Sequence, residues 1–276
     1  MQDRVACVLR DAGLRSFERE AAWLVEAATG IKPPKLFLEA EGVEDAAARR
    51  ALELAHRRAS GEPLQYVTGM AAFRYLELAV GPGVFIPRPE TELVAEHAMS
   101  RLRQGGTVVD VGTGSGAIAL SLAHERPDAR VIATESSTAA LTWATANRAR
   151  LDLDVELIEC DLLSGLVFKL EDQVDVIVAN PPYVRPDEGP SLERDVVDYE
   201  PAEALFAGEN GLRAIRRLGQ QARRWLRPGG WMVIEIGPEQ SDAVGDLLGG
   251  QGYEEIGVHE DLAERPRIAE ARRKRS

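Results

Sequence analysis

From Gly106 onward, short apolar runs alternate with longer amphipathic stretches, and this alternation restricts the possible folds more than any other feature. Six of the runs have the length and the β-branched content of buried strands. These runs are Thr107–Val111, Arg130–Glu135, Val155–Glu159, Val174–Ala179, Gly230–Ile236 and Tyr253–His259. Because helical stretches fill much of the sequence between them, we predict an α/β fold with a mostly parallel sheet covered by helices on both faces.

The N-terminal part of the chain has a helical pattern instead. Apolar residues recur at spacings of three and four positions, as one buried helical face requires. They are Val5, Leu9, Leu14, Phe17, Ala21, Leu24 and Val25. Ile31–Pro34 interrupts the pattern, and another amphipathic stretch runs from about Val43 to Ala59, before Gly61-Glu62-Pro63. We therefore predict a small helical bundle over residues 1–75.

The sequence changes character again between the bundle and the α/β part. Extended segments are indicated by Tyr66, Val67, Phe73, Tyr75, Leu76 and Leu78, and Gly81-Pro82-Gly83 is a turn signal. We predict a β-hairpin connector at residues 76–92 and a helix from about Glu90 to Leu102. The α/β domain then spans residues 93–276.

Composition and charge exclude several classes of protein. No run approaches the roughly 18 apolar residues of a membrane span, and Met1–Arg4 does not lead into the apolar core of a signal peptide. The only cysteines, Cys7 and Cys160, are far apart, which favours a reducing, cytoplasmic setting. The net charge of −12 falls almost entirely on residues 81–276. Because nucleic-acid binding needs basic surface, this acidity argues against DNA as the main partner.

A glycine-rich loop follows the first predicted strand. The segment Val108–Gly116 (VVDVGTGSG) leads into a helix that starts near Ala117, and its glycines allow a sharp turn and close approach to a ligand. The Gly-x-Gly-x-Gly spacing, with Asp110 two positions before Gly112, differs from the Gly-x-Gly-x-x-Gly of dinucleotide-binding folds. An acid there disfavours a pyrophosphate but can orient the loop around a zwitterionic amino acid. The methionine moiety of S-adenosylmethionine has that character.

Two more acidic residues follow the next predicted strands. Glu135 ends the second strand, where a carboxylate can accept hydrogen bonds from both ribose hydroxyls. Asp161 and Leu162 follow the third strand, and Asp161 could accept a hydrogen bond from an adenine amino group. Either acid alone could be a solvated loop residue. Their order at successive strand ends favours S-adenosylmethionine as the cofactor. The four histidines show no metal-ligand spacing, so we expect no metal.

The apolar run Val174–Ala179 leads directly into Asn180-Pro181-Pro182-Tyr183. The prolines fix φ and cannot donate backbone hydrogen bonds, so the loop is rigid and its carbonyl groups are free to accept. The Asn180 side-chain oxygen and the Pro181 carbonyl can together accept both hydrogens of one NH2 group. In isolation this motif would be interpreted as a proline turn, but its position after the fourth strand favours a reactive site.

The chemistry of a planar NH2 group explains why such acceptors are needed. An amide or aniline-type nitrogen is a weak nucleophile because its lone pair is delocalised. Acceptors on its hydrogens favour pyramidalisation, aim the lone pair at a sulfonium methyl group, and stabilise the positive charge that grows on nitrogen. Tyr183 offers an aromatic face to a planar target. The motif thus predicts methyl transfer to a planar NH2 group, without separating glutamine from adenine.

Further segments make the chain resemble the peptide chain release factor glutamine methyltransferases over nearly its whole length. These segments are Phe85–Glu92 (FIPRPETE), Pro63–Gly69 (PLQYVTG), Tyr199-Glu200-Pro201 with Ala204-Leu205 and Gly208, Gly211-Leu212, and Arg227–Gly230 (RPGG). The resemblance implies methylation of the glutamine amide in the Gly-Gly-Gln motif of bacterial class I release factors. It also implies a Rossmann-like class I methyltransferase sheet and an N-terminal helical domain that helps to recognise the release factor.

The resemblance also assigns residues to the site. Asn180 and Pro181 would hold the glutamine amide with Tyr183 near it, and these three are the predicted catalytic residues. The predicted substrate site adds Pro182 and Glu200. Phe85 and Arg88 would close the cofactor site from the connector side. With the strand-end residues, the predicted cofactor site comprises Phe85, Arg88, Asp110, Gly112, Thr113, Gly114, Gly116, Glu135, Asp161, Leu162 and Asn180.

The sequence departs from the family pattern in two places. Thr134–Ser137 (TESS) replaces the usual Thr-Asp-Ile-Ser, which keeps a carboxylate of longer reach. Glu264 stands where glycine is expected and Pro266 where another residue is expected, so the local turn is in doubt.

Two other functions remain open from the motifs. The first is adenine amino-group methylation in DNA or RNA, where the base is flipped into the site. The second is a non-catalytic S-adenosylmethionine-binding module. A near-neutral helical N-terminal part argues against the first function, and the intact Asn180–Tyr183 motif argues against the second. We expect a cytoplasmic monomer with no stable nucleic-acid partner, no membrane association and a solvated basic tail at residues 271–276.

Overall fold

The computed structural model describes residues 1–31, 45–208 and 210–275, and the chain forms two compact units. The first unit contains Met1–Met70, Val80–Pro82 and Leu192–Tyr199. The second unit contains the other segments and includes the large sheet. Among the described residues, no helix has the length and apolar character needed to cross a membrane.

The first unit is built from helices α1 (Gln2–Asp11), α2 (Phe17–Thr29), α4 (Asp45–Ala59), α5 (Leu64–Thr68) and α9 (Arg194–Tyr199). Its core confirms the helical face expected from the spacing: the buried residues are Val5, Leu9, Ala21, Leu24 and Val25, with Leu14 and Phe17 partly buried beside them. Arg58 forms ion pairs with Glu20 and with Asp195 of α9, which explains why α9 groups with these helices. The interruption expected at Ile31–Pro34 and the start of the next stretch at Val43 lie outside the described residues, apart from Ile31.

One prediction for the first unit is wrong. Tyr66 and Val67 were expected in an extended segment, but they lie in helix α5 and are buried. Pro63 precedes this helix, and Gly69, with φ of 76°, ends it in the left-handed conformation. Proline before and glycine after a short helix are strong boundary signals, and here they outweigh the β preference of an aromatic and a β-branched residue.

The hairpin consists of β1 (Met70–Phe73) and β2 (Leu76–Ala79), which form a two-stranded sheet. The residues between the strands are Arg74, with φ of 50°, and Tyr75. The connector was expected at residues 76–92, but strand β1 lies before residue 76. The turn signal Gly81-Pro82-Gly83 follows strand β2. Helix α6 (Thr91–Arg101) begins one residue later than expected.

The large sheet has seven strands in the order β5-β4-β3-β6-β7-β9-β8. They are β3 (Thr107–Val111), β4 (Arg130–Glu135), β5 (Glu156–Glu159), β6 (Val174–Ala179), β7 (Leu226–Glu235), β8 (Tyr253–Glu260) and β9 (Pro266–Arg273). The first five strands in that order are parallel, and β9 is antiparallel to both of its neighbours. The mostly parallel α/β fold is thus confirmed. Strand β9 was not predicted from the sequence, and the expectation of a solvated tail from residue 271 is wrong in its first part, because β9 includes Ala271–Arg273 and Ala271 is buried.

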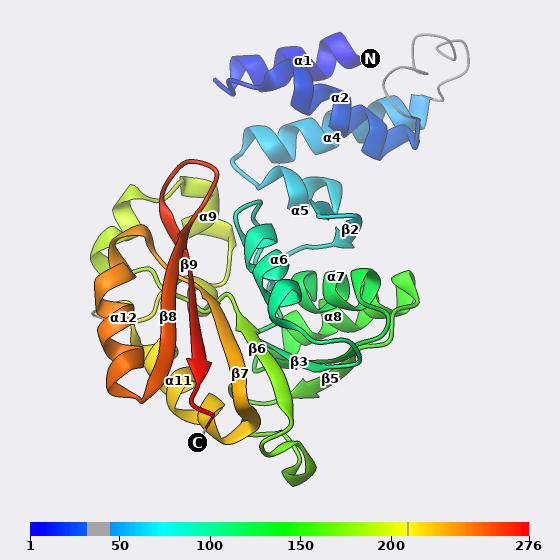
Figure 1. The fold of residues 1–276 in the computed structure, drawn as a ribbon. Coiled ribbons are helices and arrows are strands. Elements are labelled where there is room, and N and C mark those ends of the chain that lie inside the picture. Colours follow the sequence, from blue (N-terminus) through cyan, green and yellow to red (C-terminus); the bar gives the residue numbers. More distant parts are fainter. Residues whose placement is uncertain (32–44, 209, 276) are drawn as a thin grey trace. The chain divides into compact units, whose positions relative to one another are not determined.

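Helices cover both faces of this sheet (Figure 1). They are α6 (Thr91–Arg101), α7 (Ala117–Glu125), α8 (Thr138–Leu151), α11 (Arg213–Trp225) and α12 (Ser241–Gly250). The second unit also contains the short helix α10 (Ala202–Leu205) and the 3-10 helices η1 (Phe168–Leu170), η2 (Pro186–Ser191) and η3 (Pro238–Gln240). Alternate residues of β6 separate the two cores, because Val176 packs with α6 and α7 whereas Ile177 packs with α11 and α12. Burial on both faces explains why the central strands are continuous apolar runs.

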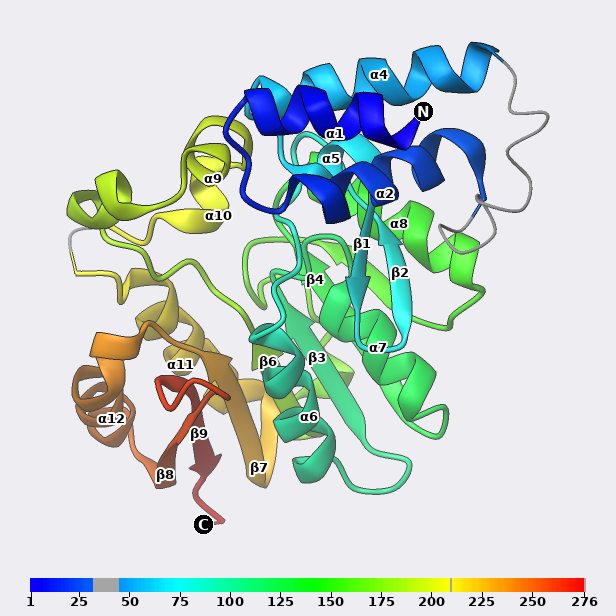
Figure 2. The same cartoon turned by 90° about the horizontal axis from the view of Figure 1, so that it is seen from above.

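The side of the sheet to which the chain adds strands changes between β3 and β6. From β3 the chain adds β4 and β5 on one side, and it then returns to β6 on the other side. Figure 2 shows β3, β6 and β7 side by side. In the register, Val111 pairs with Ala179, and Ala179 pairs with Ile234. The residues that follow these three strands therefore meet at one edge, where ligands bind in sheets of this kind.

Candidate active site

A cavity of about 340 Å³ lies in the second unit at the carboxyl ends of β3, β4 and β6. Ten predicted site residues line it: Phe85, Gly112, Thr113, Gly114, Glu135, Asp161, Leu162, Asn180, Pro181 and Pro182. Five predicted residues do not line it: Arg88, Asp110, Gly116, Tyr183 and Glu200. The cavity thus joins the glycine loop, the acids at two strand ends and the proline motif.

Asp110 holds the glycine loop from behind. Its buried carboxylate accepts hydrogen bonds through Oδ2 from the Thr113 hydroxyl (2.6 Å) and the Ala119 N–H (3.1 Å). Gly112 and Gly114 have φ of 73° and 59°, and open space surrounds the position of a Cβ atom at each. The requirement for glycine is therefore conformational. Burial raises the pKa of Asp110 to about 7.

Glu135 lies at the carboxyl end of β4 and organises the neighbouring backbone. Its Oε2 accepts the Gly114 N–H at 2.9 Å, and its Oε1 accepts the N–H groups of Ser136 (2.7 Å) and Ser137 (2.9 Å). The side chain is 8% exposed and lines the cavity. A carboxylate oxygen accepts about two hydrogen bonds, so Oε2, which accepts only the Gly114 N–H, keeps capacity toward a ligand hydroxyl, whereas Oε1 is already occupied by two backbone donors.

Asp161 lines the cavity from the loop after β5, and it is not isolated. Its Oδ2 is paired with the guanidinium of Arg217 from α11. Arg213 and Arg217 both line the cavity, so α11 brings two positive charges to a wall that otherwise carries acids. The sequence analysis did not single out either arginine, because nothing local marks which residues of a long helix face a ligand.

The segment that contains Phe85 is fixed by Glu200. The buried Glu200 carboxylate accepts the Ile86 N–H (3.0 Å) and pairs with the Arg88 guanidinium, which lies 4.7 Å from the centre of the Phe85 ring. Phe85 lines the cavity, as expected. Glu200 and Arg88, expected to contact the ligands, hold this segment in place without lining the cavity.

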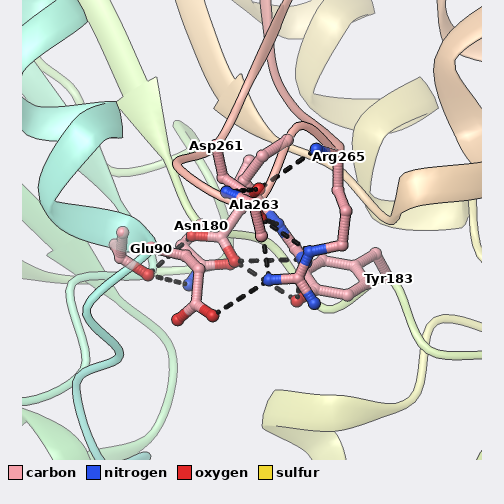
Figure 3. Close-up of polar contacts among 9 residues, drawn as sticks. Glu90, Asn180, Tyr183, Asp261, Ala263 and Arg265 are labelled. Carbon is pink, nitrogen blue, oxygen red and sulfur yellow. Dashed lines mark hydrogen bonds and ion pairs between the residues drawn. The ribbon is translucent and has the colours of Figure 1, made fainter.

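Asn180 belongs to a hydrogen-bond network beside the cavity that is partly buried and is fully buried between Thr91 and Glu235 (Figure 3). Its Nδ2 donates to the Thr91 hydroxyl at 3.0 Å, and the Thr91 hydroxyl donates to Glu235 Oε2 at 2.6 Å. Tyr183 donates its hydroxyl to Glu235 Oε1 at 3.2 Å and accepts from Arg267 at 3.0 Å. The Tyr183 hydroxyl is thus directed away from the cavity. Burial and the neighbouring Glu235 raise the pKa of Tyr183.

Three residues of this hydrogen-bond network were not predicted from the sequence: Thr91, Glu235 and Arg267. Thr91 lies within the segment Phe85–Glu92 that carried the resemblance. Glu235 ends a strand as Glu135 does, so the same strand-end argument could have found it. Arg267 comes from β9, the strand that was not predicted.

The loop between β8 and β9 turns tightly beside this hydrogen-bond network. Asp261 Oδ1 accepts the N–H groups of Ala263 (2.8 Å) and Arg265 (3.1 Å), and its Oδ2 accepts Arg265 Nε at 2.9 Å. Figure 3 shows this loop next to Asn180 and Tyr183. Glu264 has φ of 58°, the left-handed conformation that favours glycine. Pro266 is tolerated because it is the first residue of its strand.

Two of the four histidines come together elsewhere in the second unit. His97 Nδ1 and His259 Nε2 lie 2.8 and 3.2 Å from the oxygens of the buried Glu270. The three ligand atoms lie within 4.8 Å of one another, a proximity that sequence spacing did not indicate. However, Arg101 Nη2 lies 2.6 Å from the same carboxylate. Its charge already neutralises Glu270 and disfavours a cation there.

Comparisons with known proteins match both parts of the chain. Residues 2–69 match the family described as PrmC N-terminal domain, and residues 78–198 match the Methyltransferase small domain. The chain is 42% identical to the release factor glutamine methyltransferase of Streptomyces coelicolor, over 96% of this chain and 94% of that protein. The proteins of the same name from Mycolicibacterium smegmatis and Moorella thermoacetica are 40% and 43% identical, over 92% and 94% of this chain and 96% and 92% of theirs.

Solved structures share the fold at lower identity. The 16S rRNA N2 G1207 methyltransferase of T. thermophilus superposes with a TM-score of 0.56 at 21% identity, over 74% of this chain and 50% of that one. A methyltransferase from Pyrococcus furiosus superposes with a TM-score of 0.54 at 18% identity, over 83% of this chain and 99% of that one. At these identities the likeness concerns the fold alone.

Proposed function

The chain belongs to the release factor glutamine methyltransferase family, and we propose that it methylates the glutamine side-chain amide in the Gly-Gly-Gln motif of bacterial class I release factors. S-adenosylmethionine is the methyl donor. The observation that carries the proposal is the orientation of Asn180: its Nδ2 donates to Thr91, which leaves its oxygen free to accept from an NH2 group at the cavity.

The residues around the cavity fit this cofactor, which supplies a methyl group on a positively charged sulfur. Gly112 and Gly114 provide open backbone where a methionine moiety with its ammonium group can lie, and the buried Asp110 holds this loop from beneath through Thr113 and Ala119. Glu135 stands at the strand end where ribose hydroxyls are accepted. Phe85 adds an aromatic wall. Acidic groups next to a cationic ligand stabilise it electrostatically.

Asn180 and Pro181 then hold the acceptor. The Asn180 oxygen and the Pro181 carbonyl accept the two hydrogens of the glutamine NH2, which turns the nitrogen lone pair toward the methyl group. As the N–C bond formed and the S–C bond broke, S-adenosylhomocysteine would leave and positive charge would develop on this nitrogen, so both acceptors would bind more strongly than in the ground state. The nitrogen would then lose one proton to water. Pro182 lines the cavity beside them, and the fixed φ angles of the two prolines keep the loop rigid. Tyr183 anchors the loop through its hydrogen bonds with Glu235 and Arg267.

The helical bundle serves recognition of the release factor in this proposal. Its match to the N-terminal domain of the same family supports that role. We assign recognition to residues 1–75, the connector to residues 76–92 and catalysis to residues 93–276. The enzyme acts as a monomer in the cytoplasm, without a stable nucleic-acid partner or membrane association.

The test is methyl transfer from radiolabelled S-adenosylmethionine to purified release factors, each as wild type and with the tripeptide glutamine replaced by alanine. Label should appear only on the wild-type factors. The Asn180→Ala variant should transfer no label while its cofactor dissociation constant, measured by calorimetry, stays within several-fold of the parent. Labelling of the replaced factors would overturn the assigned acceptor.

The bundle is tested separately, because a recognition role predicts an effect on one substrate only. In a chain that lacks residues 1–70, the KM for the release factor should rise more than the cofactor dissociation constant does. An equal loss of both would mean that the bundle supports folding instead.

A further inference from the structure

A side-chain amide can present either end to a ligand, and the two ends of Asn180 have opposite effects. If its oxygen faces the cavity, it accepts a hydrogen from the substrate NH2. If its NH2 end faces the cavity, two donors confront each other and the acceptor cannot be held. What decides the orientation of Asn180 is therefore part of the machinery, and the residues next to its other end are Thr91 and Glu235.

The hydrogen bonds of Glu235 fix which group donates and which accepts throughout this hydrogen-bond network. Burial raises the pKa of Glu235, and Arg267, 4.0 Å from its Oε1, opposes this effect by favouring the ionised form. An ionised carboxylate only accepts, so the Thr91 hydroxyl donates its single hydrogen to Glu235 Oε2. The Thr91 oxygen can then only accept from Asn180, and it selects the Nδ2 end. The other Glu235 oxygen is occupied by the Tyr183 hydroxyl. The donors thus point one way, from Asn180 through Thr91 to Glu235.

The Thr91 hydroxyl and the Glu235 carboxylate are buried, so solvent water does not replace the hydrogen bond between them. Thr91 is 4% exposed and Glu235 is 2% exposed, so water does not compete for their hydrogen bonds. An inverted Asn180 would place its oxygen against the Thr91 lone pairs, and the part-buried hydrogen bond from Nδ2 to Thr91 would be lost. A chain that ends on a charge also polarises its members, which makes the free Asn180 oxygen a better acceptor.

We propose that Thr91 and Glu235 are positioning residues that hold Asn180 with its oxygen toward the acceptor amide. Thr91 lines the cavity and Glu235 does not, and both act through the orientation of Asn180. The inference rests on the proposed methylation of a glutamine NH2 and adds two residues that no motif of the sequence analysis assigned to the reaction. It predicts that their loss lowers the rate of methyl transfer and not the binding of the cofactor.

Isosteric substitutions test the Thr91 hydroxyl directly. Thr91→Val keeps the shape but removes the hydroxyl, so kcat for release factor methylation should fall about 10- to 100-fold, as expected for one buried hydrogen bond. Thr91→Ser restores the hydroxyl and should return kcat to within several-fold of the parent. The cofactor dissociation constant should change by less than several-fold in both. The matched control is Thr107→Val. Thr107 begins β3, at the end of the strand away from the glycine loop, so this substitution should leave kcat unchanged.

A double-mutant cycle tests whether Glu235 acts through the same path. Glutamine at position 235 can donate to Thr91, which frees the Thr91 hydrogen for the Asn180 oxygen and permits inversion. Glu235→Gln should therefore lower kcat by a factor similar to that of Thr91→Val, and the double variant should lose little more than either. Thermal unfolding of each variant checks that the comparison is made on folded protein.

The outcomes separate this inference from the proposed function. If the parent does not methylate release factors, the proposed function fails. If the parent is active but Thr91→Val keeps the parent kcat, the positioning role is wrong. The inference is equally refuted if Thr91→Ser loses as much as Thr91→Val, or if cofactor affinity falls in parallel with kcat. Multiplied losses in the double variant would show that Glu235 acts independently of Thr91.

Discussion

The difference in unfolding free energy between Asp110→Asn and the parent should rise in favour of the variant as the pH rises. The carboxylate is 1% exposed, and only its Oδ2 accepts hydrogen bonds, from Thr113 and Ala119. Its Oδ1 is buried with no hydrogen-bond partner among the described residues. An asparagine of the same shape keeps both bonds by placing its oxygen at the Oδ2 position, and it removes the buried charge.

The magnitude follows from the pKa. Burial raises the pKa of Asp110 from 3.8 to about 7, and the hydrogen bonds from Thr113 and Ala119 offset only part of this effect. Because the folded pKa lies above the unfolded one, the folded state holds more protons between them, and the free energy of unfolding decreases as the pH rises through this window. Roughly 3 pKa units correspond to about 4 kcal/mol. Asparagine does not titrate, so the variant lacks this decrease.

The assay is urea unfolding of parent and Asp110→Asn at several pH values from about 4 to 8. Both should carry Trp23→Phe, because the other three tryptophans lie in the second unit and then report on it alone. The difference in unfolding free energy, variant minus parent, should rise by about 4 kcal/mol over this range. The control Asp246→Asn removes an exposed charge and should show no such trend. Parallel curves for parent and Asp110→Asn would refute the argument.

Three further outcomes follow from the second unit. Gly116→Ala should lower the thermal unfolding temperature more than Gly112→Ala, because both have positive φ but only the Gly116 Cβ would lie 2.8 Å from a side-chain atom. Glu200→Gln should raise the cofactor dissociation constant in calorimetry, since it weakens the pairing that holds residues 85–88 against the cavity. Burial raises the pKa of Glu270, but hydrogen bonds from an arginine and a histidine outweigh it and hold the pKa below 4.5. Its contribution to stability should be present above that pH and lost as the pH falls through the folded pKa, and in Glu270→Gln this acid-side loss should shrink in unfolding curves.

Much of the second unit could be predicted because both of its sheet faces are buried. Strands such as Val174–Ala179 are then unbroken apolar runs, and the structure places them as expected. Strand β9 escaped prediction because its sequence, Pro266–Arg273, carries a proline, a glutamate and three arginines. Its buried Glu270 and Arg267 bind partners far away in sequence, Arg101 and Tyr183 respectively, which no local pattern reveals.

The candidate site divides in the same way. Residues at strand ends, such as Glu135 and Asn180, follow from topology, because parallel strands deliver their carboxyl ends to one edge. Residues that support them depend on tertiary geometry. Glu200 was expected to contact substrate, but it bonds the backbone of Ile86, 114 positions earlier in the chain. Asp110 was expected in the cofactor site and lies behind it, since its strand position turns the side chain into the core.

The pairing of Val111 with Ala179 has a consequence for how this enzyme could be altered. Pairing between strands changes only in whole steps of about 3.3 Å, and a single step would turn every apolar side chain of β6 to the opposite face. The separation between the donor loop and the acceptor clamp therefore cannot drift gradually with mutations in the core. Fine adjustment of that separation is confined to the few residues beyond the strand ends, Gly112–Gly116 and Asn180–Tyr183.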